Sequence, residues 1–205
     1  MKVLMLNGSP RVNGNTSIAL AEMKRVFDAE GIEVEIVQVG AMDVRGCIAC
    51  ASCKDTGKCI FDDIVNQIAA KLEEADGLVL ASPVYYASAN GTLISLLDRL
   101  FYCSHFDKTM KVGASVAVAR RGGCSTTFDE LNKYFTICGM PVASSQYWNS
   151  VHGRAVGEAA QDAEGLQTMT TLARNMAFLM KSIALGKEKY GLPEKEEPIH
   201  TNYIR

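Results

Sequence analysis

The sequence predicts an α/β fold in which helices cover both faces of a parallel sheet. Short apolar runs of strand length alternate with longer stretches whose apolar residues recur at helical spacing, from the first residue onward. The connections between these runs are short. Strands that alternate with helices in this way form a doubly wound sheet of three layers.

Five segments have the pattern of strands, and they cover residues 2–6, 32–39, 77–82, 112–119 and 141–148. Helices are expected at 16–29, after Asp62-Asp63, and at 91–102, 126–138 and 158–185. The two aspartates are placed to cap a helix, because their carboxylates accept from its first free N–H groups. We expect one domain over residues 1–185 and a tail or arm over 186–205, where apolar periodicity fades.

Composition excludes several classes of protein. Apolar residues make up 48% of the 205 residues and charged residues 21%, which excludes wholesale disorder. The net charge of −2 lacks the basic field that non-specific nucleic-acid binding requires. No apolar stretch reaches the roughly 18 residues of a membrane span. The first apolar run ends at Asn7, too early for a signal peptide, so we expect a cytoplasmic protein.

The loop over residues 8–17, which follows the first strand, has the features of a phosphate site. Asn15, Thr16 and Ser17 open the next helix, where free N–H groups, hydroxyls and the helix dipole favour an anion. Arg11 can supply the charge that a dianionic phosphate requires. The loop matches neither a Walker A motif nor G-x-G-x-x-G. An ordinary helix-capping turn is the alternative.

Two further loops follow strands at the same predicted edge. In residues 82–91, Tyr85 and Tyr86 can form an aromatic wall against a flat ring. In residues 119–126, paired glycines allow close backbone approach, and two arginines can stabilise an anionic ring or phosphate. Taken singly, tyrosines in a loop and adjacent arginines are ordinary packing and surface features. Three such loops at one edge indicate a bound mononucleotide.

The cysteines form a second motif, C-x2-C-x2-C-x5-C, over residues 47–59. Cys47, Cys50, Cys53 and Cys59 can supply four thiolates to a 4Fe–4S cluster, although the last spacing departs from the common ferredoxin run. Zinc and unliganded thiols are the alternatives, and zinc more often uses two separated C-x2-C pairs. Because this loop follows the second strand, we expect it at the same edge as the three loops described above.

The segments GSPRVNGNT, SPVYYASANGTLISLLDR and RRGG resemble the FMN-binding loops of NAD(P)H-dependent FMN reductases, a branch of the flavodoxin-like superfamily. With the cysteine motif, the chain resembles the iron–sulfur flavoproteins within that branch, over roughly residues 1–185. The resemblance implies FMN, strand order 2-1-3-4-5, and a homodimer or homotetramer. It places the phosphate at Ser9, Arg11, Asn15, Thr16 and Ser17. It places the isoalloxazine ring between two sets of residues, with Pro83, Val84, Tyr85 and Tyr86 on one side and Arg120, Arg121, Gly122 and Gly123 on the other.

These features predict an FMN-dependent oxidoreductase that passes electrons from NAD(P)H to a small acceptor, such as a quinone, an azo or nitro compound, or free flavin. The flavin carries the chemistry, so no side chain is expected to act as a general acid or base. The alternative is an iron–sulfur flavoprotein electron carrier that accepts electrons from ferredoxin and has no small-molecule substrate. A hydrolase is not supported, because the sequence contains no G-x-S-x-G motif.

A few chemically active residues lie outside these motifs. His152 follows the fifth predicted strand, where it can lie beside the ring, at a subunit contact, or simply on the surface. Cys103, Cys124 and Cys138 are expected to be core or loop thiols. Cys124 belongs to the third loop and is a candidate for redox sensitivity.

Overall fold

A computed structural model, which describes residues 1–201, contains one five-stranded parallel sheet. The strands are β1 (Lys2–Asn7), β2 (Glu33–Gln38), β3 (Gly77–Pro83), β4 (Val112–Ala119) and β5 (Ser150–His152). Their order across the sheet is β2-β1-β3-β4-β5, and every neighbouring pair is parallel. The predicted fold class is confirmed.

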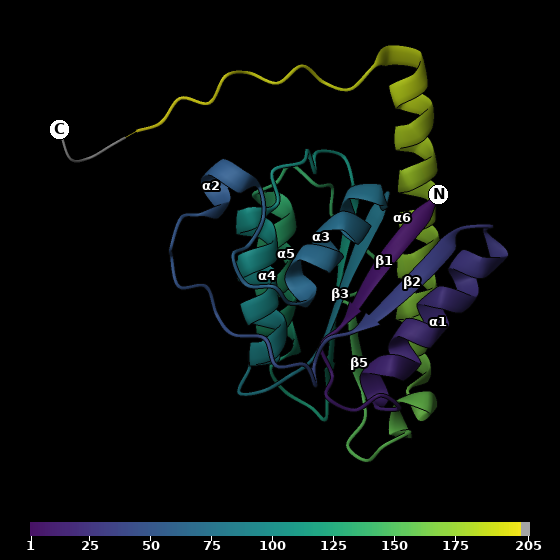
Figure 1. The fold of residues 1–205 in the computed structure, drawn as a ribbon. Coiled ribbons are helices and arrows are strands. Elements are labelled where there is room, and N and C mark those ends of the chain that lie inside the picture. The colour runs from purple at the N-terminus through teal and green to yellow at the C-terminus, as the bar shows by residue number, and fades with distance from the viewer. Residues whose placement is uncertain (202–205) are drawn as a thin grey trace.

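Helices cover both faces of the sheet (Figure 1). α1 (Asn15–Ala29) and α6 (Ala163–Tyr190) lie on one face, and α3 (Ile64–Glu74), α4 (Gly91–Cys103) and α5 (Cys124–Thr136) lie on the other. Alternate residues of β1 therefore enter two different cores: Val3 packs with α1 and α6, whereas Leu4 packs with α3 and α4. Within residues 1–201, no helix is long and apolar enough to cross a membrane.

The predicted aspartate cap is present, and Asn90 caps α4 in the same way. Asp63 accepts the Val65 N–H at 3.1 Å at the start of α3, while its neighbour Asp62 caps nothing there. Asn90 accepts the N–H groups of Thr92 at 2.7 Å and Leu93 at 3.4 Å at the start of α4. Each cap satisfies N–H groups that have no partner inside the helix.

The fifth strand differs from its prediction. Residues 141–148 do not form it; only Val142 pairs with β4, in a single bridge to Gly113, and β5 begins at Ser150. The physical reason is Ser145, whose hydroxyl donates to the Tyr147 carbonyl at 2.6 Å and accepts from the Tyr147 N–H at 3.3 Å. This local turn replaces the backbone ladder over the middle of the predicted strand.

Several helix boundaries also differ. The segment predicted as a helix over 158–185 is a 3-10 turn, η1 (Glu158–Gln161), followed by α6, which continues through Gly186 to Tyr190. α5 covers Cys124–Thr136, so it begins and ends two residues earlier than the predicted helix over 126–138. Of the predicted tail over 186–205, residues 191–201 contain no helix or strand, and 202–205 lie outside the described residues.

Two glycine-to-alanine substitutions test this packing. A Cβ at Gly113 would lie 2.4 Å from Cγ of the buried Phe135 ring, so we expect Gly113→Ala to lower the free energy of unfolding by about 1–3 kcal/mol. Gly186 lies in α6 with open space around it, so Gly186→Ala should raise stability by about 0.5–1 kcal/mol. Urea denaturation followed by circular dichroism measures both. Equal effects of the two substitutions would contradict this description of the β4–α5 interface.

Candidate functional site

Loops that follow β1, β3 and β4 meet at the carboxyl edge of the sheet, at the bottom of Figure 1. Backbone hydrogen bonds fix where each loop leaves the sheet. The Gly8 N–H donates to the Ala81 carbonyl at 2.7 Å, and the Val84 N–H donates to the Val118 carbonyl at 2.9 Å. The structure therefore brings the three predicted nucleotide loops together.

The first loop presents unpaired backbone N–H groups. α1 begins after Gly14, and no side chain caps its amino terminus. Arg11 is exposed, while Ser9 is buried and its hydroxyl accepts the Arg11 N–H at 3.1 Å. An uncapped helix start with an exposed guanidinium beside it suits a phosphate group.

Of the side chains predicted to hold phosphate, Asn15 and Ser17 have other partners in the structure and Thr16 is buried. Asn15 donates to the Ala155 carbonyl at 2.9 Å and accepts the N–H groups of Gly157 and Ala159, so it ties α1 to the loop after β5. Thr16 is buried, and the Ser17 hydroxyl donates to the Val12 carbonyl. The backbone N–H groups of this turn are thus better placed for an anion than these side chains, whose phosphate role stays a prediction.

Sequence reasoning missed Gly40, which follows β2 and supports the first loop from behind. A Cβ at this position would lie 2.2 Å from the Gly8 carbonyl oxygen and 2.3 Å from the Ser9 carbonyl carbon. The Gly40 N–H also donates to the Asn7 carbonyl at 3.1 Å. A glycine directly after the second strand was the available signal.

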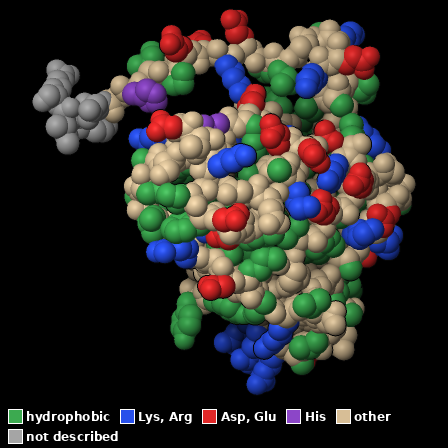
Figure 2. Space-filling model, viewed as in Figure 1, with side chains coloured by type: hydrophobic (Ala, Val, Ile, Leu, Met, Phe, Trp, Pro, Cys, Tyr) green, Lys and Arg blue, Asp and Glu red, His purple; other side chains and the backbone are tan. Residues whose placement is uncertain are grey.

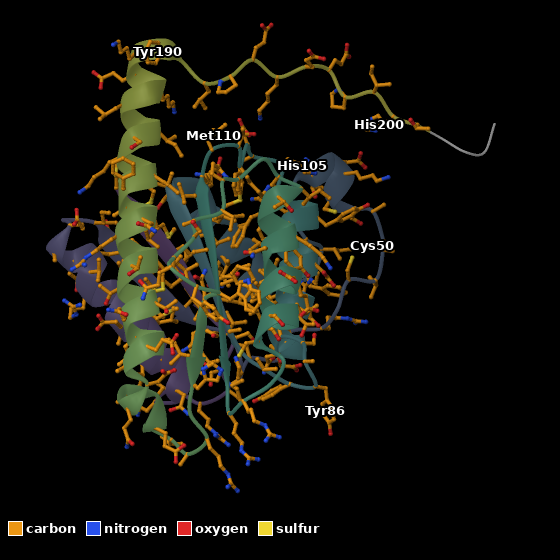
Figure 3. All side chains as sticks on the ribbon, turned by 180° about the vertical axis from the view of Figure 1, so that it is seen from behind. Cys50, Tyr86, His105, Met110, Tyr190 and His200 are labelled. Atoms are coloured by element: carbon orange, nitrogen blue, oxygen red, sulfur yellow. The ribbon has the colours of Figure 1, made fainter. Side chains whose placement is uncertain are left out.

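The second loop is a tight turn centred on Tyr86 and Ala87. Tyr85 and Ser88 exchange backbone hydrogen bonds of 2.8 and 3.1 Å across it, and both central residues have positive φ, 51° and 59°. Positive φ is costly for a bulky residue, so the surroundings must hold the turn. Glu130 of α5 does so, accepting the Ser88 hydroxyl at 2.9 Å and the Ala89 N–H at 2.8 Å. The Tyr86 side chain projects freely from the edge (Figure 3).

The third loop lies against the second. Gly123 has a φ of 88°, and a Cβ there would lie 2.8 Å from Val84 and 2.9 Å from the Ala87 Cα. Arg120 and Arg121 are exposed beside Gly122, and Arg154 after β5 is exposed as well. Figure 2 shows Lys and Arg side chains gathered at this end of the molecule. The edge is therefore positively charged although the whole chain is slightly acidic.

The cysteine loop lies elsewhere than predicted. It leaves the carboxyl edge after β2, but its cysteines and the short helix α2 (Cys53–Thr56) lie along the outer side of α4 (Figure 1). Gly57 approaches His105, beyond the far end of α4. Figure 3 places Cys50 on the flank, well above Tyr86. The expected position beside the other loops is wrong, because the chain from Gly40 to Asp62 runs outward along α4 rather than across the edge.

All four predicted cysteines line one hollow, together with Arg99, Tyr102 and Cys103 of α4. Within residues 1–201, no three His, Cys, Asp or Glu side chains are grouped closely enough to hold a single metal ion. A single ion requires ligands that converge on one point, at about 2.3 Å for thiolate. A 4Fe–4S cluster takes each thiolate on a different iron, so its ligands surround a volume instead. Four thiols around one hollow are the donor set that a 4Fe–4S cluster takes.

The backbone of this loop is suited to an anion. Ala49 and Ala51 have positive φ, 53° and 61°, and Ser52 after them is right-handed. Such alternation aims successive N–H groups into one concavity, which is common at phosphate and iron–sulfur sites. Hydrogen bonds from the N–H and hydroxyl of Ser52 lower the pKa of the exposed Cys50 thiol.

A buried guanidinium lies behind the hollow. Arg99 is 1% exposed, and it donates to Cys59 Sγ from Nε at 3.3 Å and from Nη2 at 3.1 Å. It also pairs with both carboxylate oxygens of Asp63, at 2.6 and 3.0 Å. Burial opposes its charge, but these partners raise the pKa of Arg99 above its ordinary value. Sequence reasoning did not single out Arg99, although it ends the segment SPVYYASANGTLISLLDR.

Comparison with known proteins gives the family. The model for NADPH-dependent FMN reductases matches residues 1–155. The chain belongs to this family. It is therefore a member of an FMN-binding family of oxidoreductases, and the predicted resemblance is confirmed.

Two relatives carry a more specific description. The chain is 36% identical over 191 residues to an iron–sulfur flavoprotein of Methanocaldococcus jannaschii, an alignment that covers 89% of this chain and 99% of the relative. It is 30% identical over 193 residues to an iron–sulfur flavoprotein of Methanosarcina thermophila, covering 92% and 100%. These relatives share the whole length of the domain.

Solved structures agree on the fold. RosB, crystallised with a riboflavin-phosphate intermediate, superposes with a TM-score of 0.71 at 17% identity, covering 100% of this chain and 94% of RosB. An archaeal flavodoxin superposes with a TM-score of 0.59 at 15% identity, covering 88% and 99%. The fold of the chain is flavodoxin-like.

Gly40→Ala tests the support of the first loop. Because a Cβ would collide with backbone atoms of Gly8 and Ser9, we expect the loop to shift and the affinity for FMN to fall about tenfold or more. Gly46→Ala is the matched control, since its nearest neighbour would be the Ser95 hydroxyl at 4.0 Å. Fluorescence titration of the apoprotein with FMN measures both affinities. Equal affinity of the two variants would contradict the role given to Gly40.

Proposed function

We propose that this protein is an iron–sulfur flavoprotein electron carrier that accepts electrons from ferredoxin, with FMN at the carboxyl edge and a 4Fe–4S cluster in the cysteine hollow. One observation carries the proposal: four cysteines from a single loop line one hollow beside a buried arginine that donates to Cys59. Relatives of the same length are iron–sulfur flavoproteins, which supports the same assignment. When bound, FMN supplies hydride and single-electron transfer and the cluster supplies single-electron transfer.

The chain's own residues bind and orient these groups. The N–H groups that open α1, with Arg11, would hold the phosphate, and the turn at Tyr86 would border the ring opposite Gly122 and Gly123. Cys47, Cys50, Cys53 and Cys59 would ligate the cluster. Arg99 would offset part of the negative charge that four thiolates bring to a half-buried site.

Replacing a ligand tests the cluster assignment. Cys53→Ser should lose most of the iron, because a hydroxyl is a poor substitute for a soft thiolate. Cys138→Ser is the control, since this thiol lies outside the hollow and should retain iron. FMN content should be unchanged in both variants, because the flavin loops lie at another place in the fold. Iron and acid-labile sulfide per chain are measured after anaerobic reconstitution.

The cluster assignment also has a clear contrary outcome. Wild-type protein that binds a full complement of FMN but neither iron nor sulfide would show that these thiols are not cluster ligands. Zinc in place of iron, with no sulfide, would favour the single-ion alternative.

A second candidate function is NAD(P)H-dependent reduction of a quinone, an azo or nitro compound, or free flavin. The observation that favours it is the excess of exposed arginines at the carboxyl edge, where Arg120, Arg121 and Arg154 add to Arg11. One FMN phosphate does not require four guanidinium groups, and a docked dinucleotide would bring further phosphates to this edge. The name of the family model is consistent with this candidate.

Anaerobic stopped-flow spectroscopy separates the two functions. We expect reduced ferredoxin to bleach the absorbance of the bound flavin in the wild-type protein, and Cys53→Ser to slow this at least tenfold because the entry site for single electrons is lost. Under the second candidate, NADPH or NADH would reduce the flavin equally fast in both proteins. Reduction by nicotinamide alone, with no effect of ferredoxin, would replace the carrier with the reductase.

A further inference from the structure

The structure brings together a cysteine, a histidine and an aspartate from three separate elements at the carboxyl edge. Cys124 opens α5, His152 ends β5, and Asp162 caps α6. The Cys124 Sγ lies 3.9 Å from His152 Nε2, and His152 Nδ1 lies 3.6 Å from Asp162 Oδ2. A nucleophile, a base and a carboxylate beside the base thus lie next to one another, at separations longer than ordinary hydrogen bonds, as catalytic contacts often are in a site without its reactant.

The aspartate is rigidly placed. Its Oδ2 accepts the backbone N–H of His152 at 2.6 Å, and its Oδ1 accepts the Gly165 N–H at 2.9 Å. A Cβ on Gly165 would lie 2.3 Å from Oδ2, so a glycine is required where the carboxylate lies against α6. Because the carboxylate cannot move away, it can hold one nitrogen of the imidazole and leave the other directed at the thiol.

The surroundings of Cys124 act on the thiol in opposite directions. Gly123 precedes α5 with positive φ and no side chain caps the helix, so its free N–H groups and dipole favour a thiolate at the first helical residue. Burial acts against this and raises the pKa of Cys124. A half-buried thiol in this position therefore depends on a neighbouring base to react at neutral pH. His152 is that neighbour, and its side chain is 45% exposed, so water can reach the ring.

We propose that Cys124 is a nucleophilic thiol, activated by His152 and Asp162, that forms a mixed disulfide with low-molecular-weight disulfides. The proton of Cys124 Sγ passes to His152 Nε2, and the thiolate attacks one sulfur of the incoming disulfide. A new S–S bond forms as the old one breaks, and the leaving thiolate takes the proton back from His152. Cys124 is oxidised, and the incoming disulfide is reduced to one thiol plus the group that stays bound.

This activity is separate from the proposed electron transfer. The cysteine hollow lies along α4, whereas Cys124 lies in the third loop beside Gly122 and Gly123. The reaction requires neither iron nor FMN, so its test succeeds or fails whatever the outcome of the cluster assignment.

Cys138 provides a matched control within the same protein. It is also half-buried, burial raises its pKa as well, and it follows the carboxyl end of the same helix that Cys124 begins. The two thiols differ in the end of the helix dipole that they face, in the contact with His152, and in Lys108, whose charge lowers the pKa of Cys138. Because Lys108 favours a thiolate at Cys138, a faster reaction of Cys124 would be due to the helix start and to His152.

The experiment treats purified full-length protein with glutathione disulfide at neutral pH and follows each cysteine by site-resolved mass spectrometry. We expect Cys124 to be glutathionylated about tenfold or more faster than Cys138. His152→Ala should remove most of this advantage, and added imidazole should restore it by filling the space of the missing ring. A structural role of His152 would not respond to imidazole.

Asp162→Asn is a second variant, and its result does not require that the His152→Ala protein folds. The amide oxygen of asparagine can still accept the Gly165 N–H that caps α6, but its NH2 cannot accept the His152 N–H and brings no charge to the imidazole, so we expect a several-fold slower reaction of Cys124 and no change at Cys138. The proposal is overturned if Cys124 reacts no faster than Cys138, or if its rate is the same in wild type and both variants while circular dichroism shows that they are folded.

Discussion

All five strands run in the same direction, and the arrangement of the functional loops follows from this constraint. Each strand must be followed by a loop at the carboxyl edge and by a helix that returns along the sheet. Segments that are far apart in the sequence, such as Gly8 and Ala81, therefore meet. Short backbone bonds anchor the loops to neighbouring strands, for example from the Gly153 N–H to the Ala119 carbonyl at 3.0 Å. The edge is fixed by the same hydrogen bonding that builds the sheet.

The cysteine hollow depends on a different interaction, the buried contact of Arg99 with Asp63 and Cys59. Removing one partner from such a pair typically costs about 3–5 kcal/mol, because the other charge is left buried. Asp63 also caps α3, and the Arg99 Nη1 donates to the Arg45 carbonyl at 3.2 Å. One guanidinium thus joins two helices and both ends of the cysteine loop. An apolar side chain would fill this place at lower desolvation cost, but it would leave the Asp63 carboxylate and the Cys59 thiol without the charge that they contact.

The sequence was sufficient for the fold because local and long-range signals agree. Apolar periodicity, and caps such as Asp63 and Asn90, identify strands and helices, and parallel topology then places the loops. It was insufficient where side chains compete with the backbone, as Ser145 does in the predicted fifth strand. It was also insufficient for the path of residues 40–62, which have no periodicity and are positioned by Arg99. The approach of His152 to Cys124 depends on tertiary packing and has no signal in the spacing.

The separation of the two candidate centres follows from α4. This helix begins at the carboxyl edge, after the Tyr86 turn, and reaches Arg99 nine residues beyond its cap at Asn90, which is roughly 13 Å at 1.5 Å per residue. The cysteine loop is therefore presented on the flank of the molecule, away from the flavin loops, with Cys47 and Cys50 exposed and Cys53 buried. A protein that exchanges electrons with two different partners benefits from such separate surfaces.

Strain in the cysteine loop points to the same function. Ala49 and Ala51 adopt left-handed conformations, which cost a residue with a Cβ about 1–2 kcal/mol each and which glycine would adopt freely. The hydrogen bonds that these two residues make in return are one of 3.4 Å from the Ala49 N–H to Cys47 Sγ and one of 2.9 Å from the Lys54 N–H to the Ala51 carbonyl. Strain of this kind persists where surrounding interactions over-determine the backbone, and it is concentrated at functional sites. A ligand that binds the N–H groups and the four thiols together would supply the missing interaction, so the conformation is better suited to a filled hollow than to a loop of free cysteines.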